Sequence, residues 1–138
     1  MIILDTNVLS ALMKLPKDPL VIEWFGRQPR SSIWTTAVTV FEIRFGLHIM
    51  EKGRRRNILV DAFDAALVMM GGRIAPFDAA AAHEAAELMA VRRNKGTPVD
   101  MRDTMIAGIA LAHRATLATR NTAHFEDLSI PVVNPWNA

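Results

Sequence analysis

Short apolar runs alternate with longer helical segments along this chain of 138 residues. The apolar runs are four or five residues long, which is typical of buried strands, and turn or capping residues follow them. Apolar residues at helical spacing fill the segments between these runs. The alternation predicts an α/β fold with a mainly parallel central sheet of about five strands. The expected strands are Met1–Leu4, Ser32–Thr35, Ile74–Phe77, Ala115–Thr119 and Pro131–Asn134.

The composition predicts one globular domain over residues 1–138 and excludes several classes of site. Hydrophobic residues make up 51% of the chain and charged residues 22%, as in a protein with a substantial core. Cysteine is absent, which excludes disulfides and thiolate metal sites. The first residues do not resemble a secretory signal, and apolar runs such as 65–70 are far shorter than the ~20 residues that span a bilayer. We therefore expect a cytoplasmic protein without a membrane segment.

Residues 37–50 have the pattern of an amphipathic helix. Its apolar residues recur at i, i+3, i+7 and i+11, and we expect this stripe to face the core. The stripe consists of Val38, Phe41, Phe45 and Ile49. At about 100° per residue, Glu42 falls about 55° from the centre of the stripe. A carboxylate at the edge of a buried face is costly to desolvate unless it is paired or binds a metal. Glu42 is therefore either half of a salt bridge or a functional acid.

Asp5 directly follows the first expected strand, and Asn121 comes just after the fourth. In open parallel sheets, ligands bind beyond the carboxyl ends of the strands, so both positions are candidates for a site. Asp5 also begins a good cap-and-turn sequence, Asp-Thr-Asn, ahead of a helix that begins near Asn7. Position alone leaves open whether Asp5 is a helix cap or an active-site carboxylate.

Asp100 and Asp103 flank the start of a helix expected over residues 103–114. One of them would cap this helix, and the other would lie in its first turn, where the helix dipole favours an acid. This is a complete structural explanation of the pair, and by itself the pair indicates no function.

Asp5, Glu42 and Asp103 together indicate more than any one of them. They lie at a strand end, on an inner helical edge and at a helix start, and a doubly wound sheet can bring such points together at its carboxyl edge. Clustered carboxylates repel one another and are tolerated mainly when a hard cation neutralises them. Ligation by oxygen alone suits Mg²⁺ or Mn²⁺, which commonly act on phosphate esters.

Four segments, taken in order, resemble the PIN-domain ribonucleases, in particular the VapC-like toxins of bacterial toxin–antitoxin pairs. The family's opening strand, with its first acid at Asp5, is similar to MIILDTNVLSAL. Its second segment, with Glu42, is similar to TTAVTVFEIRFGL. Its third, with Asp103 at the start of the D-x-x-I-A stretch, is similar to DMRDTMIAGIALAHRATLATRN, and its closing strand to PVVNPW. The resemblance covers nearly the whole chain and implies a PIN-like α/β/α sandwich.

The resemblance further implies a metal-dependent endoribonuclease that hydrolyses RNA phosphodiester bonds with an activated water. Asp5, Glu42 and Asp103 would be the catalytic acids and would hold Mg²⁺ or Mn²⁺ directly or through water, with Asp100 nearby. Thr6 and Asn7 would orient Asp5 or the water, although Thr6 is equally well explained as a residue of the first helical turn. Asn121 would be a further residue around the metal or the substrate.

The chain departs from its relatives after the fourth strand, where many of them have a further acid. Asn121 and His124 stand there instead. Asn121 still offers a carbonyl oxygen, and we expect His124 to be a surface residue. The departure leaves an alternative function, a catalytically weakened PIN-like binding module that acts through its antitoxin or RNA partner. A purely structural protein in which the acids are caps is a third possibility. A phosphatase of the haloacid dehalogenase type is disfavoured because Asn7 occupies the place of its second acid.

The implied partners are RNA and a small DNA-binding antitoxin that inhibits the site. The resemblance implies a homodimer that forms a heterotetramer or a larger complex with the antitoxin. Apolar residues of the N-terminal half are candidates for the antitoxin groove: Leu9, Leu12, Met13, Phe45 and Met50. The formal net charge of +2 permits a nucleic-acid partner. Two basic runs could contact RNA or could simply be solvated helix ends: Lys52 with Arg54–Arg56, and Arg92, Arg93 and Lys95.

Overall fold

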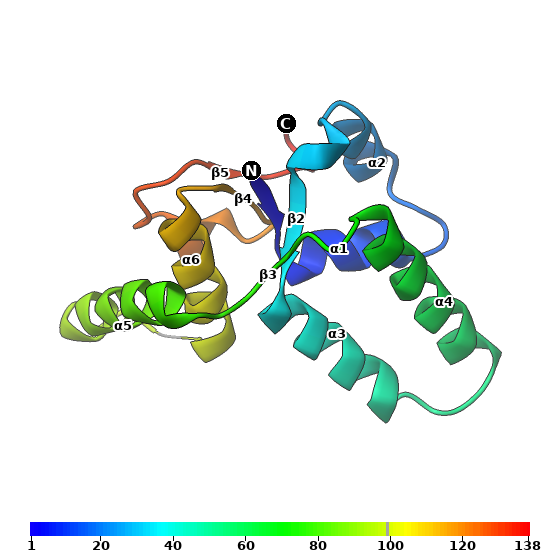
Figure 1. Ribbon diagram of the computed structural model, residues 1–138, viewed down its shortest axis with the longest axis horizontal. Helices are drawn as coiled ribbons and strands as arrows, with labels where there is room; N and C mark the ends of the chain where they lie inside the picture. Colours follow the sequence, from blue (N-terminus) through cyan, green and yellow to red (C-terminus); the bar gives the residue numbers. More distant parts are fainter. Residues whose placement is uncertain (99) are drawn as a thin grey trace.

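The computed structural model describes residues 1–98 and 100–138, and within them five strands form one parallel sheet (Figure 1). The strand order is β3-β2-β1-β4-β5, so β1 lies at the centre with β2 and β4 on either side. This arrangement confirms the predicted α/β class and makes the sheet parallel throughout. The strands are β1 (Ile2–Leu4), β2 (Ile33–Thr36), β3 (Ile74–Ala75), β4 (Thr116–Ala118) and β5 (Val132–Val133).

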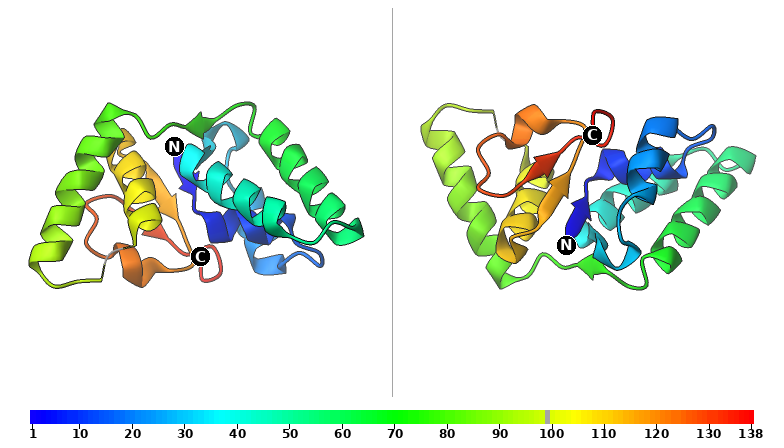
Figure 2. Two further views of the ribbon diagram at one scale, coloured as in Figure 1. Left: turned by 90° about the horizontal axis from the view of Figure 1, so that it is seen from below. Right: turned by 90° about the horizontal axis from the view of Figure 1, so that it is seen from above.

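Helices cover both faces of the sheet, as Figures 1 and 2 show. On one side lie α1 (Thr6–Met13), α2 (Pro19–Gly26), α3 (Ala37–Ile49) and α4 (Arg54–Met69). On the other side lie α5 (Ala79–Asn94) and α6 (Met101–His113). Two short 3₁₀ helices are labelled η1 (Arg30–Ser32) and η2 (Thr122–Phe125). No helix of the described residues is long and apolar enough to cross a membrane.

The central strand β1 separates two hydrophobic cores. Leu4 packs into the core under α1 to α4, whereas Ile3 packs into the core under α5 and α6. This alternation follows from the period of two in a strand, and both faces are apolar because helices cover both. The polar residue that follows, Asp5, therefore emerges at the carboxyl edge of the sheet between the two helical layers.

Aspartates cap several of these helices. Asp5 accepts from Thr6 N, Asp78 from Ala81 N and Asp100 from Asp103 N at the starts of α1, α5 and α6. Each side-chain oxygen satisfies a backbone N–H that has no partner inside its helix. Asp5 therefore does cap a helix, which the sequence left open, and of the Asp100–Asp103 pair it is Asp100 that caps and Asp103 that lies in the first turn.

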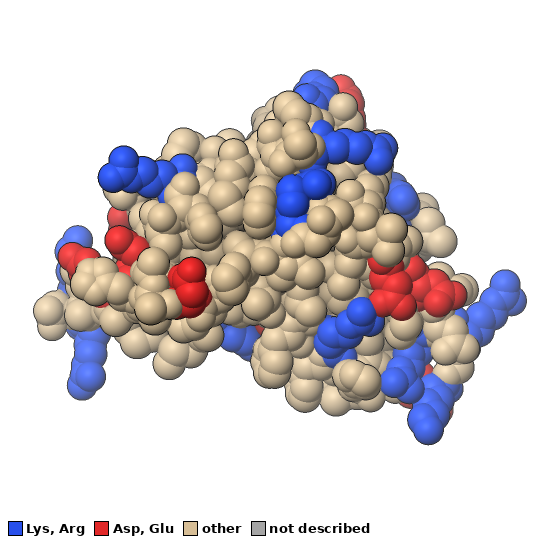
Figure 3. Space-filling model, viewed as in Figure 1, with Lys and Arg blue, Asp and Glu red and all other residues tan. Residues whose placement is uncertain are grey.

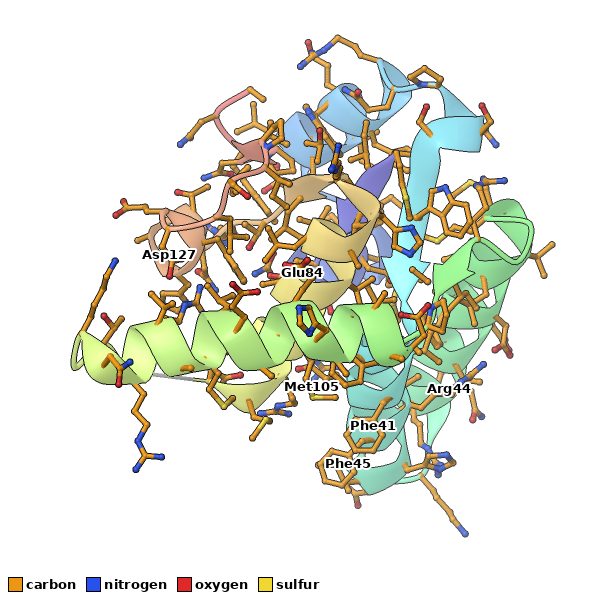
Figure 4. All side chains as sticks on the ribbon, turned by 60° about the vertical axis from the view of Figure 1, so that its left-hand side comes forward. Phe41, Arg44, Phe45, Glu84, Met105 and Asp127 are labelled. Carbon is orange, nitrogen blue, oxygen red and sulfur yellow. The ribbon has the colours of Figure 1, made fainter. Side chains whose placement is uncertain are left out.

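The predicted buried stripe of α3 is wrong at three of its four positions, and only Val38 is buried. Phe41, Phe45 and Ile49 are 62%, 52% and 69% exposed. Figure 4 shows Phe41 and Phe45 projecting from α3, with their rings stacked at a centroid distance of 6.3 Å. The buried face contains Thr39, Ile43 and Leu47 besides Val38. This helix is apolar on two faces, so its periodicity could not select the one that packs against the rest of the molecule.

Close packing of α5 on α6 sets the position of the start of α6. A Cβ atom on Gly108 of α6 would lie 2.6 Å from the carbonyl oxygen of Ala81 and 2.6 Å from the Cβ of Ala85. Only glycine fits at this crossing, because the atoms it meets are the backbone and Cβ of α5. The contact fixes α6 against α5 and so fixes Asp103 relative to the sheet edge.

Candidate active site

Asp5 is the most buried acid of the site, at 3% exposure. Its Oδ1 accepts from Thr6 N (2.8 Å), and its Oδ2 accepts from Thr119 Oγ1 (2.8 Å) and Asn7 Nδ2 (3.4 Å). The pKa of Asp5 is raised from 3.8 to about 6, mainly by burial; the charges of Asp103 and Glu42 contribute to the rise, and the hydrogen bonds from Thr119 and Thr6 oppose it. Asp5 is thus a helix cap and also a carboxylate whose charge is poorly compensated.

Glu42 faces the same region from α3, on the inner side of that helix as predicted. Its side chain is 18% exposed, and its Oε1 accepts from Thr6 Oγ1 at 2.9 Å. Thr6 Oγ1 in turn lies 3.1 Å from Thr39 Oγ1 on α3. The second oxygen, Oε2, lies 3.6 Å from Nη1 of Arg102. Thr6 therefore contacts a second acid besides Asp5, so it does more than occupy the first turn of α1.

Asp103 approaches the other two acids from the first turn of α6. Its pKa is raised by burial first and by the charge of Asp100 second, while contact with His124 lowers it. His124 Nδ1 lies 3.4 Å from Asp103 Oδ2, although the His124 side chain is largely exposed. The prediction that His124 is only a surface residue is therefore incomplete, because the histidine is in contact with a candidate catalytic acid.

Arg92 is not available as an RNA contact, in contrast to the prediction for the second basic run. It is 4% exposed, and its guanidinium donates to both carboxylate oxygens of Asp127 at 2.8 and 2.9 Å. The same guanidinium donates to the backbone carbonyl of His124 (2.8 Å) and to Thr104 Oγ1 (3.4 Å). The end of α5 is thereby tied to η2 and to α6, on either side of Asp103.

Asn7 contacts the acid Asp5 through its side chain, whereas Asn121 joins the site through its backbone. Asn7 donates to Asp5 Oδ2, and its Oδ1 accepts from the backbone N–H of Arg120 at 3.1 Å. It thus links α1 to the end of β4 and contacts Asp5. Asn121 joins the site through its backbone N–H, which donates to Thr119 Oγ1 at 3.1 Å. Asn121 is exposed, and the expected use of its side-chain oxygen remains a prediction.

The chemistry of these donors fits a hard divalent cation. Three carboxylates from β1's end, α3 and α6 converge, and the pKa of Asp5 responds to the other two. Oxygen donors of this kind suit Mg²⁺ or Mn²⁺, and a cation would relieve their repulsion. As the side chains stand, no three His, Asp or Glu side chains within residues 1–98 and 100–138 are grouped closely enough to hold one ion between them. Water-mediated ligation by some of the acids fits this spacing, because Mg²⁺ usually keeps several of its waters.

Comparison with known proteins gives the family of the chain. A family model described as the PIN domain matches residues 2–130. The chain belongs to the PIN domain family. This PIN domain is 39% identical over 137 residues to the VapC ribonuclease Y4jK of Sinorhizobium fredii, covering 99% of this chain and 98% of that protein. It is 31% identical over 138 residues to the toxin FitB of Neisseria gonorrhoeae, covering 99% of both chains.

A solved structure of FitAB bound to an IR36 DNA fragment superposes on this PIN domain with a TM-score of 0.90. The sequences are 32% identical, and the match covers 99% of this chain and 96% of that one. The family resemblance inferred from the four sequence segments is thus confirmed, together with the PIN-like fold.

Two threonine hydroxyls of the site, those of Thr119 and Thr39, were not predicted from the sequence. Thr119 directly follows β4, as Asp5 directly follows β1, and its hydroxyl donates to Asp5. That shared position at neighbouring strand ends was a usable signal. Thr39 lies three residues before Glu42, close to one turn of α3, and its hydroxyl is beside that of Thr6. Nothing in the sequence distinguished Thr39 from an ordinary helical threonine.

Proposed function

We propose that this PIN domain is the toxin of a toxin–antitoxin pair, a Mg²⁺- or Mn²⁺-dependent endoribonuclease that hydrolyses RNA phosphodiester bonds in the cytoplasm. The observation that carries the proposal is the convergence of Asp5, Glu42 and Asp103, in which burial and two neighbouring carboxylates raise the pKa of Asp5 to about 6. Such an arrangement costs stability in the folded protein and is explained by the binding of a cation. The relative named as a VapC ribonuclease supports RNA as the substrate.

Asp5 and Asp103 would hold the metal, with Glu42 binding directly or through water and Asp100 close by. When bound, the metal would lower the pKa of an attacking water and stabilise charge on the phosphate and on the leaving oxygen. The chain's own groups prepare the acids for this. Thr119 and the Thr6 backbone N–H orient the two oxygens of Asp5, and the Thr6 hydroxyl donates to Oε1 of Glu42.

His124 would lie at the rim of the cluster, where relatives carry a further acid. Its Nδ1 is 3.4 Å from Asp103, and the Arg92 hydrogen bond to its carbonyl holds the turn that carries it. A cavity of about 450 Å³ opens beside it and is also lined by Lys95, Asp100 and Asp103. This cavity is large enough to take part of an RNA strand next to the acids. The alternative function, a catalytically weakened binding module, rests on the same feature: the side chains of His124 and Asn121 stand where many relatives have an acid.

The first basic run is the better candidate for an RNA surface. Lys52, Arg54 and Arg55 are exposed around the start of α4. Figure 3 shows Lys and Arg side chains gathered at the end of the molecule where α3 connects to α4. Of the second run, only Arg93 and Lys95 are exposed. Phosphate contacts from such side chains would make RNA binding weaken as salt rises.

The proposed partner is a small DNA-binding antitoxin that inhibits the acid site, with a toxin homodimer in a heterotetramer or larger complex. A structure of FitAB with a DNA fragment supports this assembly. The antitoxin would dock in an apolar cavity of about 480 Å³ between α1, α2 and α4, which includes Leu9, Leu12 and Met13 of the predicted groove. Phe45, also predicted there, is exposed on α3 and is not among the residues that line this cavity.

The test is cleavage of a mixed RNA substrate by the purified, antitoxin-free protein in Mg²⁺, in Mn²⁺ and in EDTA. Asp5→Asn and Asp103→Asn would be compared with Asp61→Asn, a control in an exposed acid of α4. We expect cleavage that requires metal, disappears in both site variants and persists in the control. Activity that survives EDTA or both site variants would refute the assignment of the acids. Metal binding without cleavage of any RNA would favour the weakened binding module.

A further inference from the structure

Arg102 occupies an electrostatically unfavourable position on its own helix. It lies in the first turn of α6, between Asp100 and Asp103. The free N–H groups at a helix start carry partial positive charge, which disfavours a cation there. The side chain instead reaches α3, where its Nη1 lies 3.6 Å from Glu42 Oε2. The guanidinium is therefore held at the acid cluster by carboxylate charge.

The contact between Arg102 and Glu42 is loose. A distance of 3.6 Å is too long for a direct hydrogen bond, and the Arg102 side chain is 53% exposed. Glu42 Oε1 already has a closer partner in Thr6 Oγ1, at 2.9 Å. Within residues 1–98 and 100–138, no other Lys or Arg nitrogen lies within 4 Å of a carboxylate oxygen of the three acids. Among the described residues, Arg102 is thus the basic side chain at the acids, and it can move away from Glu42 without breaking a strong hydrogen bond.

We propose that Arg102 exchanges partners: it neutralises Glu42 in the metal-free protein and binds an RNA phosphate beside the scissile bond once a divalent cation occupies the acid cluster. This inference rests on the proposed function. With a cation held by the acids, Glu42 would no longer attract the guanidinium, and the Arg102 side chain is long and exposed enough to turn toward solvent. The planar guanidinium then matches the two oxygens of a phosphate, a geometry that lysine lacks.

The exchange has two consequences that a solvated surface charge would not have. Metal and Arg102 compete for the same carboxylate, so removal of the guanidinium should tighten metal binding in the absence of RNA. The contact with RNA should exist only when metal is present, because Glu42 otherwise holds the side chain. The first consequence is measurable without any catalytic activity.

Arg102→Gln, Arg102→Lys and Arg27→Gln test the proposal. Arg27 is the control, because it is 49% exposed and lies 3.1 Å from the carboxylate of Glu23, far from the acids; it also donates to Ala138 O at 2.9 Å. Mn²⁺ affinity would be measured by calorimetry on the RNA-free protein. KM and kcat would be measured in Mg²⁺ with a short single-stranded RNA over a range of salt concentrations. RNA affinity in EDTA would be measured by fluorescence anisotropy, and thermal unfolding would verify that each variant folds.

For Arg102→Gln we expect Mn²⁺ to bind about threefold tighter or more, since a competing charge is lost. KM should rise about tenfold, with kcat within about twofold of the wild type. The slope of log affinity for RNA against log salt concentration should fall by about 1, which corresponds to the loss of one phosphate contact. RNA affinity in EDTA should stay within about twofold of the wild type. Arg102→Lys should keep the wild-type Mn²⁺ affinity and show an intermediate KM. Arg27→Gln should change none of these.

Unchanged Mn²⁺ affinity and KM in Arg102→Gln would overturn the proposal and make Arg102 a solvated charge. Tighter Mn²⁺ binding with unchanged KM would overturn the phosphate contact. An equal loss of RNA affinity in EDTA and in Mg²⁺ would overturn the exchange. If the wild type binds Mn²⁺ but cleaves no RNA, the proposed function fails, while the Mn²⁺ titration still decides whether Arg102 competes with the metal.

Discussion

Replacement of Asp5 by asparagine should stabilise the fold while it removes a catalytic acid. Asp5 is almost fully buried, and its pKa is raised from 3.8 to about 6. A rise of about two pKa units corresponds to a penalty of about 3 kcal/mol for the ionised form in the folded protein. The amide of the Asp5→Asn variant would keep the bond from Thr6 N but would present an NH₂ group to the Thr119 hydroxyl or to Asn7. If these altered hydrogen bonds cost about 1 kcal/mol, the free energy of unfolding of Asp5→Asn at pH 7.5 should exceed that of the wild type by about 2 kcal/mol.

The gain should depend on pH with a definite sign. Below pH about 4, Asp5 is protonated in both folded and unfolded chains, so it carries no charge penalty. Between pH about 4 and about 6, the unfolded chain releases its proton while the folded one keeps it, so the wild type loses stability as pH rises. Above pH about 6 the penalty is constant. Asp5→Asn does not titrate, so its advantage should appear through this window and vanish or reverse at pH 4.

Urea unfolding followed by circular dichroism between pH 4 and 8 would measure the effect, in metal-free buffer. Asp61→Asn is the control, because an exposed carboxylate should change stability by no more than about 0.5 kcal/mol. Added Mg²⁺ should stabilise the wild type and leave Asp5→Asn nearly unchanged, since an ion that binds only the folded state stabilises it. An Asp5→Asn variant less stable than the wild type at pH 7.5 would show that the hydrogen bonds to the carboxylate outweigh its desolvation, contrary to this reasoning.

Three further outcomes test the packing around the site. Arg92→Met should lower the free energy of unfolding by about 3 kcal/mol, because it leaves Asp127 and the His124 carbonyl unpaired; adding Asp127→Asn should recover part of the loss in urea titrations. Gly108→Ala should destabilise by about 2 kcal/mol in the same assay, because its methyl group meets the backbone of α5. Thr119→Val should raise the pKa of Asp5 further, since it removes a donor to the carboxylate; a carboxyl-carbon NMR titration that moves the other way would contradict the contact.

Local interactions explain why much of the fold was predictable. Strand β1 and the cap at Asp5 follow from neighbouring residues alone, as do the start of α5 at Asp78 and the stop near Gly96, whose φ of +69° suits glycine. Parallel strands place their carboxyl ends at one edge of a sheet, so the sequence by itself predicts Asp5 at that edge.

The inward position of Glu42 was predicted correctly from an incorrect stripe. Glu42 was expected about 55° from the centre of a stripe that includes Phe41 and Phe45. These two side chains are exposed, and Glu42 lies inward because it is next to Ile43 on the face with Thr39. Period and hydrophobicity are properties of one helix. The choice between its two apolar faces depends on which neighbours cover it, and this information lies elsewhere in the chain.

By itself, the sequence determined the class of fold, the caps at Asp5 and Asp100 and the resemblance to the PIN domain family, because these depend on short-range patterns and on motifs. The tertiary structure alone decided the partners across long separations: Arg92 with Asp127, His124 with Asp103, and Arg102 with Glu42. An arginine at a helix end looks the same in a sequence whether it is solvated or buried. Its charge is held by a carboxylate 35 residues away in the case of Arg92, and only the packing of α5 against η2 and α6 brings the two together.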